Sequence, residues 1–532
     1  MKSTRRLLFL APLIILASSF LAGVYATGAA GASAVSTEDD IRASLRTFSM
    51  VYDVVERSNA EHLDPDKAIY NGAVPGMLRT LDPHSNFFDP KLFQLMREEQ
   101  RGHYYGVGMR VGQRNSKTMI VEVFRGAPAY KAGLRPGDVI VAVGGESTEG
   151  LTTTNVVDLL KGPRGTVVKV SVARQGHEAP LIFDVVRDEI SRDSVPYAFF
   201  IRPGIAYIQI LQFTETTSHE LDEHLKRLGE QNIKGMVLDL RGNPGGLLNE
   251  GVAVAGRFLQ KGQTIVSHRG RASAEKQYFS TTGNGGRDYP IVVLVNRASA
   301  SASEIVAGAL QDHDRAWIFG DNTFGKGLVQ TVYPLRENTG LALTTAKYYT
   351  PSNRLIQRDY SSTSFFDYYY AKNVDGKNSQ DVRMTDSGRT VYGGGGIAPD
   401  EKYTPPRANR FQIELLPPTR ESAFFNFTAK YFGATSAKLP ANWEPSQAIL
   451  NEFHQFLLDS GTTFTEAEFA ENHEWVQTQL KRETYAYAFG VDDANQIAIE
   501  TDPEVAKAIE SMPRAKALLD TAKKVIAQRS AK

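Results

Sequence analysis

The spacing of hydrophobic residues changes along the chain and predicts a different type of structure in each stretch. From 37 to 103, apolar residues such as Phe48, Val51 and Val55 recur at helical spacing, with a turn-forming break at 81–85. From 104 to 188, short β-like runs alternate with Gly and Pro, which is typical of a compact β domain. We expect strands at 118–124, 138–143 and 166–172 and one helix at 153–160.

From 189 to 405, apolar strands alternate with amphipathic helices. This alternation predicts an α/β core with a largely parallel sheet. The expected strands are 205–211, 235–240, 291–295 and 317–319, and the expected helices are 218–230, 248–259 and 303–311. Active sites on such sheets lie at the carboxyl ends of strands. Gly245, Gly246 and Ser301 are all predicted at such ends.

The final stretch, 406–532, is predicted to be a helical extension, with helical spacing at 447–458, 466–483 and 503–528. Its helical pattern is most often plain core packing. The alternatives that the sequence leaves open are a homo-oligomer interface and a binding site for an adaptor.

The chain begins with a pattern typical of export. Lys2, Arg5 and Arg6 precede a largely apolar run at 7–26, and Ala32-Ser33-Ala34 is a candidate cleavage site. Residues 1–34 are therefore interpreted as a signal peptide, or as an uncleaved membrane anchor because 20 residues can span a bilayer. Either interpretation predicts a protein that is periplasmic or anchored to the outer face of the cytoplasmic membrane.

Composition excludes several kinds of chemistry. The 532 residues include 60 basic and 60 acidic side chains, so no basic excess indicates nucleic acid. No cysteine is present, which excludes disulfides and thiol catalysis. The ten histidines are scattered and form no H-E-x-x-H motif, so we expect no metal site and no cofactor. His313 is interpreted as a solvated residue at a helix end.

One pair of segments remains where hydrolytic chemistry is plausible. Ser301 lies at the start of a predicted helix, and Lys326 lies between two glycines with Gln330 four residues later. A neutral, buried lysine can take the proton of a serine hydroxyl, and Gln330 is placed to orient its amine if the chain turns there. Spacing alone does not choose among Ser299, Ser301 and Ser303.

The same lysine also fits part of another motif. Residues 320–326 match the G-x-x-x-x-G-K half of a phosphate-binding loop, but Gly327 stands where Ser or Thr should hold Mg²⁺. This mismatch argues against nucleotide binding. The glycine turn at 242–246 is either a tight strand-to-helix connection or a source of N–H donors for an oxyanion.

These residues resemble the carboxyl-terminal processing peptidases, or tail-specific proteases, of peptidase family S41. The matching motifs are the serine segment 301–304 and Phe324-Gly325-Lys326-Gly327 with Gln330. Further matches are 238–247, 347–352, 395–400 and 81–85, and the resemblance covers roughly 40–405 in one order. It implies that Ser301 is the nucleophile, Lys326 the general base and Gln330 the residue that positions the lysine.

The resemblance also implies an oxyanion hole formed by the N–H groups of Gly246 and Ala302, with Gly245 as an alternative to Gly246. The β domain at 104–188 resembles a PDZ domain whose carboxylate-binding loop is Tyr105-Gly106-Val107-Gly108. One departure is Lys161, where family members often carry Arg before the Gly-Pro of the late turn.

The expected fold is thus an α/β protease core with an inserted PDZ-like β domain, a helical N-terminal segment and a helical C-terminal extension. The expected function is an exported serine endopeptidase that recognises apolar C-termini of proteins or peptides and processes or degrades envelope proteins. Two rivals remain: a PDZ scaffold on an inactive core, and a related hydrolase that acts on something other than protein.

Overall fold

The computed structural model describes residues 38–114, 116–174, 176–361, 368, 381–416, 422–433, 439–440 and 442–530. The predicted signal or anchor at 1–34 lies outside these residues. None of the helices within the described ranges combines the length and apolarity needed to cross a membrane. The chain forms two compact units, Met1–Gly76 and Met77–Lys532.

The first unit is helical in its described part, as predicted. It holds α2 (Glu38–Ser58), α3 (Pro65–Ala68) and the π-helical turn η1 (Ile69–Ala73), and its boundary with the second unit falls inside α4 (Val74–Arg79). Asp64 caps α3 by accepting hydrogen bonds from the backbone of the first turn, and Pro65 presets the helical φ.

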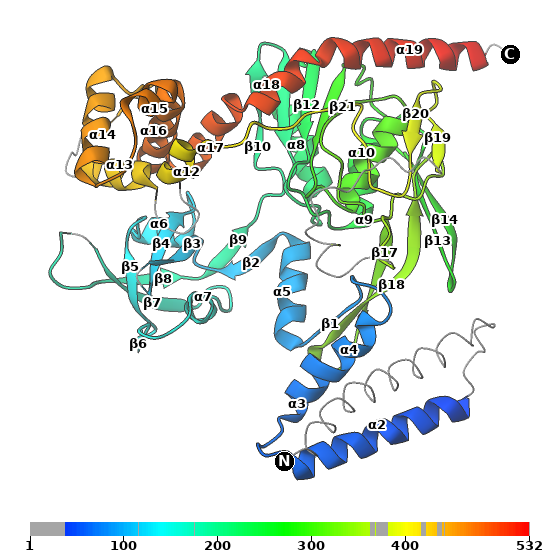
Figure 1. Cartoon of the computed structure of the whole chain (residues 1–532), viewed down its shortest axis with the longest axis horizontal. Coiled ribbons are helices and arrows are strands. Elements are labelled where there is room, and N and C mark those ends of the chain that lie inside the picture. The colour runs from blue at the N-terminus through cyan, green and yellow to red at the C-terminus, as the bar shows by residue number, and fades with distance from the viewer. Residues whose placement is uncertain are drawn as a thin grey trace, which may run out of the picture. The chain divides into compact units, whose positions relative to one another are not determined.

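The core of the second unit is a six-stranded sheet, most of which is coloured green in Figure 1. Its strands, in spatial order, are β10 (Tyr197–Arg202), β11 (Ile205–Gln209), β12 (Gly235–Asp239), β15 (Ile291–Val295), β16 (Trp317–Gly320) and β21 (Glu401–Lys402). All neighbours from β11 to β21 are parallel, and only β10 pairs antiparallel. The predicted, largely parallel α/β sheet is confirmed.

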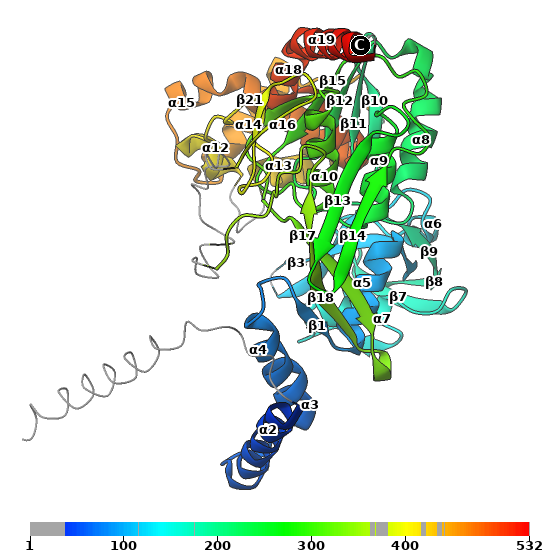
Figure 2. The same cartoon turned by 90° about the vertical axis from the view of Figure 1, so that its right-hand side faces the viewer.

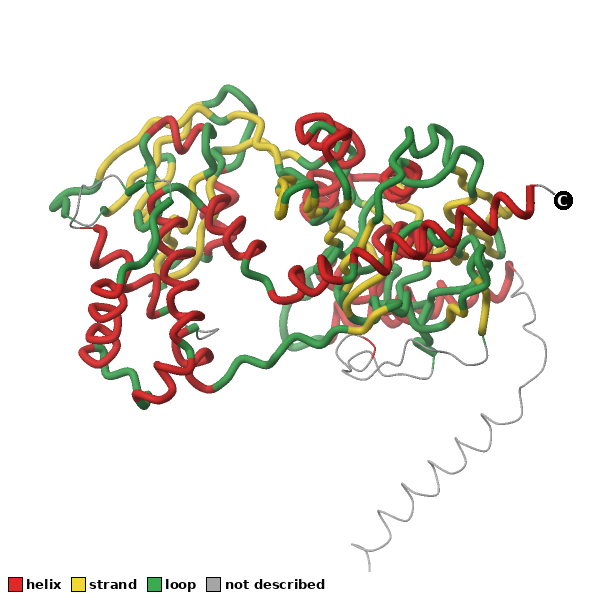
Figure 3. Tube along the Cα trace, turned by 90° about the horizontal axis from the view of Figure 1, so that it is seen from above, coloured by secondary structure: helices red, strands yellow, loops and turns green. Residues whose placement is uncertain are grey.

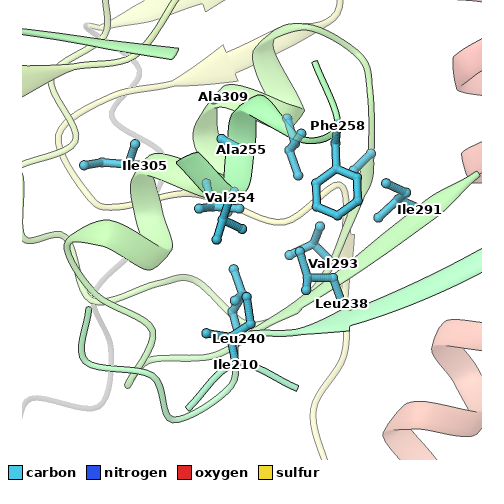
Figure 4. Packing of buried hydrophobic residues seen from close by; sticks show 14 of the residues in the cluster. Ile210, Leu238, Leu240, Val254, Ala255, Phe258, Ile291, Val293, Ile305 and Ala309 are labelled. Atoms are coloured by element: carbon cyan, nitrogen blue, oxygen red, sulfur yellow. The ribbon is translucent and has the colours of Figure 1, made fainter. Parts of the chain in front are cut away.

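One face of this sheet is covered by α8 (Thr217–Leu228), α9 (Leu248–Gly256) and α10 (Ala302–Asp312). Every residue of β12 and β15 is buried, because both faces of a parallel sheet are covered. Figure 4 shows Leu238 and Val293 of these strands packing with Phe258 and with residues of α9 and α10.

The opposite face is covered by the end of the chain. Helices α18 (Pro503–Glu510) and α19 (Met512–Ser530) bury Val505, Met512 and Ala515 against Val237 and Leu294 of the sheet. Figure 3 shows α19 as a long helix that leads to the C-terminus. The predicted helical stretch 503–528 is therefore two helices separated at Ser511, and both pack on the core.

The other helices of the extension are α12 (Arg410–Leu415), α13 (Ala423–Gly433), α14 (Gln447–Asp459), α15 (Glu466–Glu471), α16 (His473–Ala488) and α17 (Val491–Glu500). The predicted helical stretch 466–483 is interrupted at Asn472. Phe411, Phe424, Phe427 and Phe453 form a separate aromatic core among these helices.

The predicted β domain is a second sheet with its own core. Its strands are β3 (Met109–Arg114), β4 (Lys117–Val123), β5 (Val139–Val143), β7 (Val167–Ala173) and β8 (Leu181–Val186) in this order, with β6 (Glu146–Ser147) beside β5. Helix α6 (Pro128–Ala132) and helix α7 (Thr153–Leu160) pack on it, and α7 has the predicted bounds.

A third sheet carries the lysine segment and was not predicted from hydrophobic spacing. It is antiparallel and contains β1 (Asn86–Phe88), β13 (Thr264–Gly270), β14 (Ser273–Phe279), β17 (Leu328–Pro334) and β18 (Gly340–Tyr349). Figure 2 shows β13 and β14 side by side. Strand β1 comes before the β domain in the sequence, and β18 comes after Ser301 and Lys326. Their pairing therefore brings the segment around residue 86 next to the sheet that follows the lysine. The stretch 37–103 is thus not wholly helical, since 86–88 form a strand between α4 and α5 (Pro90–Arg101).

Candidate active site

Ser301 lies between β15 and α10, where the backbone is strained. Its φ and ψ are 54° and −112°, a conformation that non-glycine residues rarely adopt. Its N–H donates to the carboxylate of Glu304, 2.8 Å away, in the manner of a capping box. The side chain is thereby placed at the N-terminus of a helix, where partial positive charge favours developing negative charge.

Burial separates the three serines that the sequence left as alternatives. Ser299 and Ser303 are fully buried, and their hydroxyls donate to the carbonyls of Leu240 and Asn243. Ser301 is partly exposed, so its hydroxyl is the accessible one of the three. The geometry therefore favours Ser301 as the residue that can react.

The glycine turn after β12 packs directly on Ser301. The contact is expected, because Ser301 follows β15 and β12 and β15 are neighbouring parallel strands. Gly245 has φ +101°, and a Cβ there would lie 2.7 Å from the Cβ of Ser301. Buried Asn243 holds the turn, because its side chain accepts the N–H of Gly245 at 2.8 Å and donates to the carbonyl of Ile210. Only glycine allows this approach.

The hydrogen bonds of the turn distinguish the two candidate oxyanion donors. The N–H of Gly245 is occupied by Asn243, whereas the N–H of Gly246 has no acceptor in the described part of the chain. The same holds for the N–H of Ala302, the first residue of α10. Gly246 and Ala302 therefore supply unoccupied donors, one from the glycine turn and one from the residue after Ser301.

Lys326 is held in a setting that favours the neutral amine. Burial lowers its pKa, although Glu304 and Asp82 oppose that shift. Its Nζ donates to Oε1 of Gln330 at 2.8 Å. Gln330 lies in β17, next to a β-bulge, so the predicted contact exists but is made across an extended strand rather than a helical turn. Both side chains belong to the described residues, and no hydrogen bond joins Lys326 Nζ to Ser301 Oγ.

Four side chains gather beside the lysine loop: Phe324 belongs to the lysine motif and His84 to the segment 81–85, whereas Arg358 and Tyr368 were not assigned to the site from the sequence. His84, Phe324 and Tyr368 make edge-to-face ring contacts with one another, and the guanidinium of Arg358 lies 3.9 Å from the centre of the Phe324 ring. Burial and the neighbouring Lys326 lower the pKa of His84 to about 4, so its ring is neutral at pH 7. The turn-forming break at 81–85 was the signal in the sequence for His84.

Glu304 connects the serine and the lysine. Its fully buried carboxylate accepts hydrogen bonds from the N–H groups of Ser301, Gly325 and Lys326 and from the hydroxyl of Thr323. Burial raises the pKa of Glu304, while these donors stabilise its charged form. One side chain thus fixes the backbone on both sides of the candidate site.

The predicted carboxylate-binding loop, 105–108, consists of the last two residues of β2 (His103–Gly106) and the two residues before β3. Outside the strands, the N–H groups of Val107 and Gly108 have no acceptor among the described residues. Gly108 has φ +76°, and a Cβ there would lie 2.4 Å from that of Ala127. Strand β3 is at the edge of its sheet and contacts α7, the arrangement needed for a peptide to add as a strand.

Two other sequence interpretations have different outcomes. Lys161 pairs with Glu98 of α5 at 2.7 Å, which joins the end of α7 to the helix before the β domain.

His313 is not solvated: its ring nitrogens contact Asp386 and the carbonyl of Thr264, both at 2.7 Å. Although burial opposes it, the hydrogen bond to Asp386 raises the pKa of His313. Within the described residues, no cluster of His, Asp or Glu has the arrangement of a metal site.

Two protein families match defined parts of the chain. Peptidase family S41 matches residues 204–361, and the PDZ domain family matches residues 119–174. The first match contains Ser301, Lys326 and Gln330, and the second covers most of the separate β domain.

Curated relatives match over a longer range. A carboxy-terminal-processing protease of Bartonella bacilliformis is 40% identical over 346 residues, which are 64% of this chain and 79% of the relative. The carboxy-terminal processing protease CtpB of Bacillus subtilis is 33% identical over 362 residues, or 65% and 75% of the two chains. A solved photosystem II D1 C-terminal processing protease is 28% identical, over 67% of this chain and 86% of that one, with a TM-score of 0.35. From the sequence relatives, the chain belongs to the carboxy-terminal processing proteases of peptidase family S41, serine peptidases that here carry a PDZ domain.

Proposed function

We propose that this protease cleaves peptide bonds with a dyad of Ser301 and Lys326. The observation that carries the proposal is the shared support of the two residues: the buried carboxylate of Glu304 binds the backbone N–H of both. The neutral Lys326 amine takes the proton of Ser301 Oγ as the oxygen attacks the substrate carbonyl carbon. This step requires Nζ to turn from Gln330 towards the serine.

The rest of the cycle follows from the same groups. The N–H groups of Gly246 and Ala302 stabilise the oxyanion of the tetrahedral intermediate. Protonated Lys326 then donates its proton to the leaving nitrogen as the carbon–nitrogen bond breaks, leaving an ester on Ser301. Lys326 next takes a proton from water, whose oxygen attacks the ester, and returns a proton to Ser301 Oγ as the acid product leaves.

The PDZ domain is proposed to bind the C-terminus of the substrate. Its loop at 105–108 offers free N–H groups to a terminal carboxylate, and the edge strand β3 can pair with the residues before it. Apolar C-termini are the expected class, since the core beneath α7 and β3 is lined by Val and Leu side chains.

Export is a further part of the proposal. It is supported by the basic residues at the N-terminus and the apolar run that follows them. We therefore propose that the protease acts on envelope proteins, in the periplasm or on the outer face of the cytoplasmic membrane. Fractionation of cells that produce the full chain tests this location, and recovery in the cytoplasm would contradict it.

The main test is degradation of an unfolded reporter with an apolar C-terminal tail. Wild-type protein is compared with Ser301→Ala and Lys326→Ala, and the apolar tail with a charged one. We expect tail-dependent cleavage that falls by at least about 10³-fold in each variant. Cleavage that survives in Ser301→Ala would reject the dyad, and cleavage that ignores the tail would reject the proposed role of the PDZ domain.

A further inference from the structure

The turn at Asp82–Ser85, just before β1, is built around one buried carboxylate. Asp82 is 7% exposed. Its Oδ1 accepts the N–H groups of His84 and Ser85 at 2.8 and 2.7 Å, and its Oδ2 accepts the hydroxyl of Ser85 at 2.7 Å. Three hydrogen bonds to one side chain fix the direction of the His84 carbonyl.

That carbonyl determines which way the amide of Gln330 points. Nε2 of Gln330 donates to the carbonyl oxygen of His84, which leaves Oε1 to accept from Lys326 Nζ. The orientation matters because a neutral lysine must keep its lone pair free for the serine proton. A flipped amide would present an N–H to that lone pair and block the base.

The turn is also fastened to the hairpin that carries Gln330. The N–H of Thr344 in β18 donates to Ser85 Oγ at 3.1 Å, and Thr344 is the strand partner of Gln330 in β17. The next residue, Asn86, pairs with Ala342 of the same strand. Ser85 and Gln330 therefore share one support, and a shift of the turn would displace the amide.

We propose that Asp82 is a positioning residue for the general base, acting on Lys326 through the His84 carbonyl and the Gln330 amide. The inference rests on the proposed dyad. Its carboxylate also acts on the amine through its charge: together with Glu304, it opposes the effect of burial on the pKa of Lys326. The other ionisable groups near the lysine include His84, which is neutral at pH 7, and Arg358, which touches Phe324 and Tyr368. Burial raises the pKa of Tyr368, so its hydroxyl also stays neutral at pH 7.

The test is the pH dependence of kcat/KM for tail-dependent cleavage. Asp82→Asn keeps an oxygen for the two N–H groups but removes the charge. A missing negative charge makes the protonated amine less stable, so Lys326 remains neutral to lower pH. We expect the acid limb of the profile to move down by roughly half a pH unit.

Ser85→Ala is the second variant, because it loosens the turn and keeps the charge. We expect its kcat to fall severalfold, with the acid limb unmoved. Asp89→Asn is the matched control: it removes a carboxylate that caps α5 through the N–H of Leu92, and we expect a wild-type profile. Melting temperatures establish that all three proteins are folded.

The variants test the charge of Asp82, the turn and the dyad separately. A wild-type acid limb in folded Asp82→Asn would overturn the role of its charge, and a wild-type kcat in Ser85→Ala would overturn the role of the turn. If Asp82→Asn does not fold, the kcat of Ser85→Ala still decides whether the turn positions the base. Full cleavage by Lys326→Ala would instead overturn the dyad itself.

Discussion

Glu304 supports the site from a fully buried position, where its hydrogen bonds go to the protein itself. Its carboxylate replaces water for three backbone N–H groups and one hydroxyl, all in a fully buried place. Such a group satisfies donors that would otherwise be costly to bury. Because it binds N–H groups of both segments, it also fixes the position of the lysine loop relative to Ser301.

Glu304→Gln tests how far this carboxylate contributes to the stability of the fold and to the rate of cleavage. The amide offers one oxygen and directs its NH₂ group at donors, so at least one buried N–H loses its acceptor. We expect a loss of about 3 kcal/mol in unfolding free energy and of roughly 100-fold in kcat. Denaturant unfolding and reporter cleavage measure the two effects.

Glu468→Gln is the matched control, because Glu468 occupies the same position in the capping box of α15 but on the surface. We expect unchanged cleavage and a small change in melting temperature. Equal losses of activity in the two variants would show that Glu304 is merely another helix cap.

At the scale of elements, the site exists because β12 and β15 are adjacent parallel strands. Their carboxyl ends open at the same edge of the sheet, and the glycine turn of one lies against the serine of the other. Two of the three glycines with positive φ in this turn differ in their surroundings. A Cβ at Gly245 would meet Ser301, while a Cβ at Gly242 would meet nothing within 4 Å.

Gly245→Ala and Gly242→Ala therefore form a matched pair. Both add the strain of a left-handed residue, about 1 kcal/mol. Only Gly245→Ala should also displace Ser301, with an expected loss of roughly 100-fold or more in kcat. Measured cleavage by Gly242→Ala should stay within a few-fold of wild type, and equal activity of the two variants would contradict the packing argument.

At the scale of the whole chain, the C-terminal extension has a structural role at its end. Helices α18 and α19 cover the second apolar face of the central sheet. Arg241, which follows β12, makes ion pairs with Asp239, Asp502 and Glu504, so the glycine turn itself is connected to the last helices. Removal of these helices would expose the sheet to water.

Two substitutions on α19 test this cover. Ala515 is 1% exposed against the sheet, whereas Ala517 faces solvent. Ala515→Asp buries an unpaired carboxylate and should reduce the unfolding free energy by about 3 kcal/mol or more. Ala517→Asp should leave the melting temperature nearly unchanged. A stable Ala515→Asp protein would show that the helices dock only loosely.

Hydrophobic spacing predicted the elements of the parallel core well, because strands buried on both faces form short apolar runs between glycines. Hydrophobic spacing did not predict the antiparallel sheet. Its strands β14 and β17 are partly exposed and show no clear alternation of buried and exposed residues. Hydrophobic spacing did not place His84 at the site either: it is 242 positions before Lys326 in the sequence, and the pairing of β1 with β18 brings the two together.

The sequence by itself determined the family, the α/β class of the core, the separate β domain and the residues able to supply a serine and a lysine. These depend on local periodicity and on motifs, which are properties of short segments. Only the tertiary structure decided which serine is accessible, which glycine N–H is unoccupied and which groups lie near the lysine. Burial and hydrogen-bond partners depend on segments distant in the chain, so no local pattern contains them.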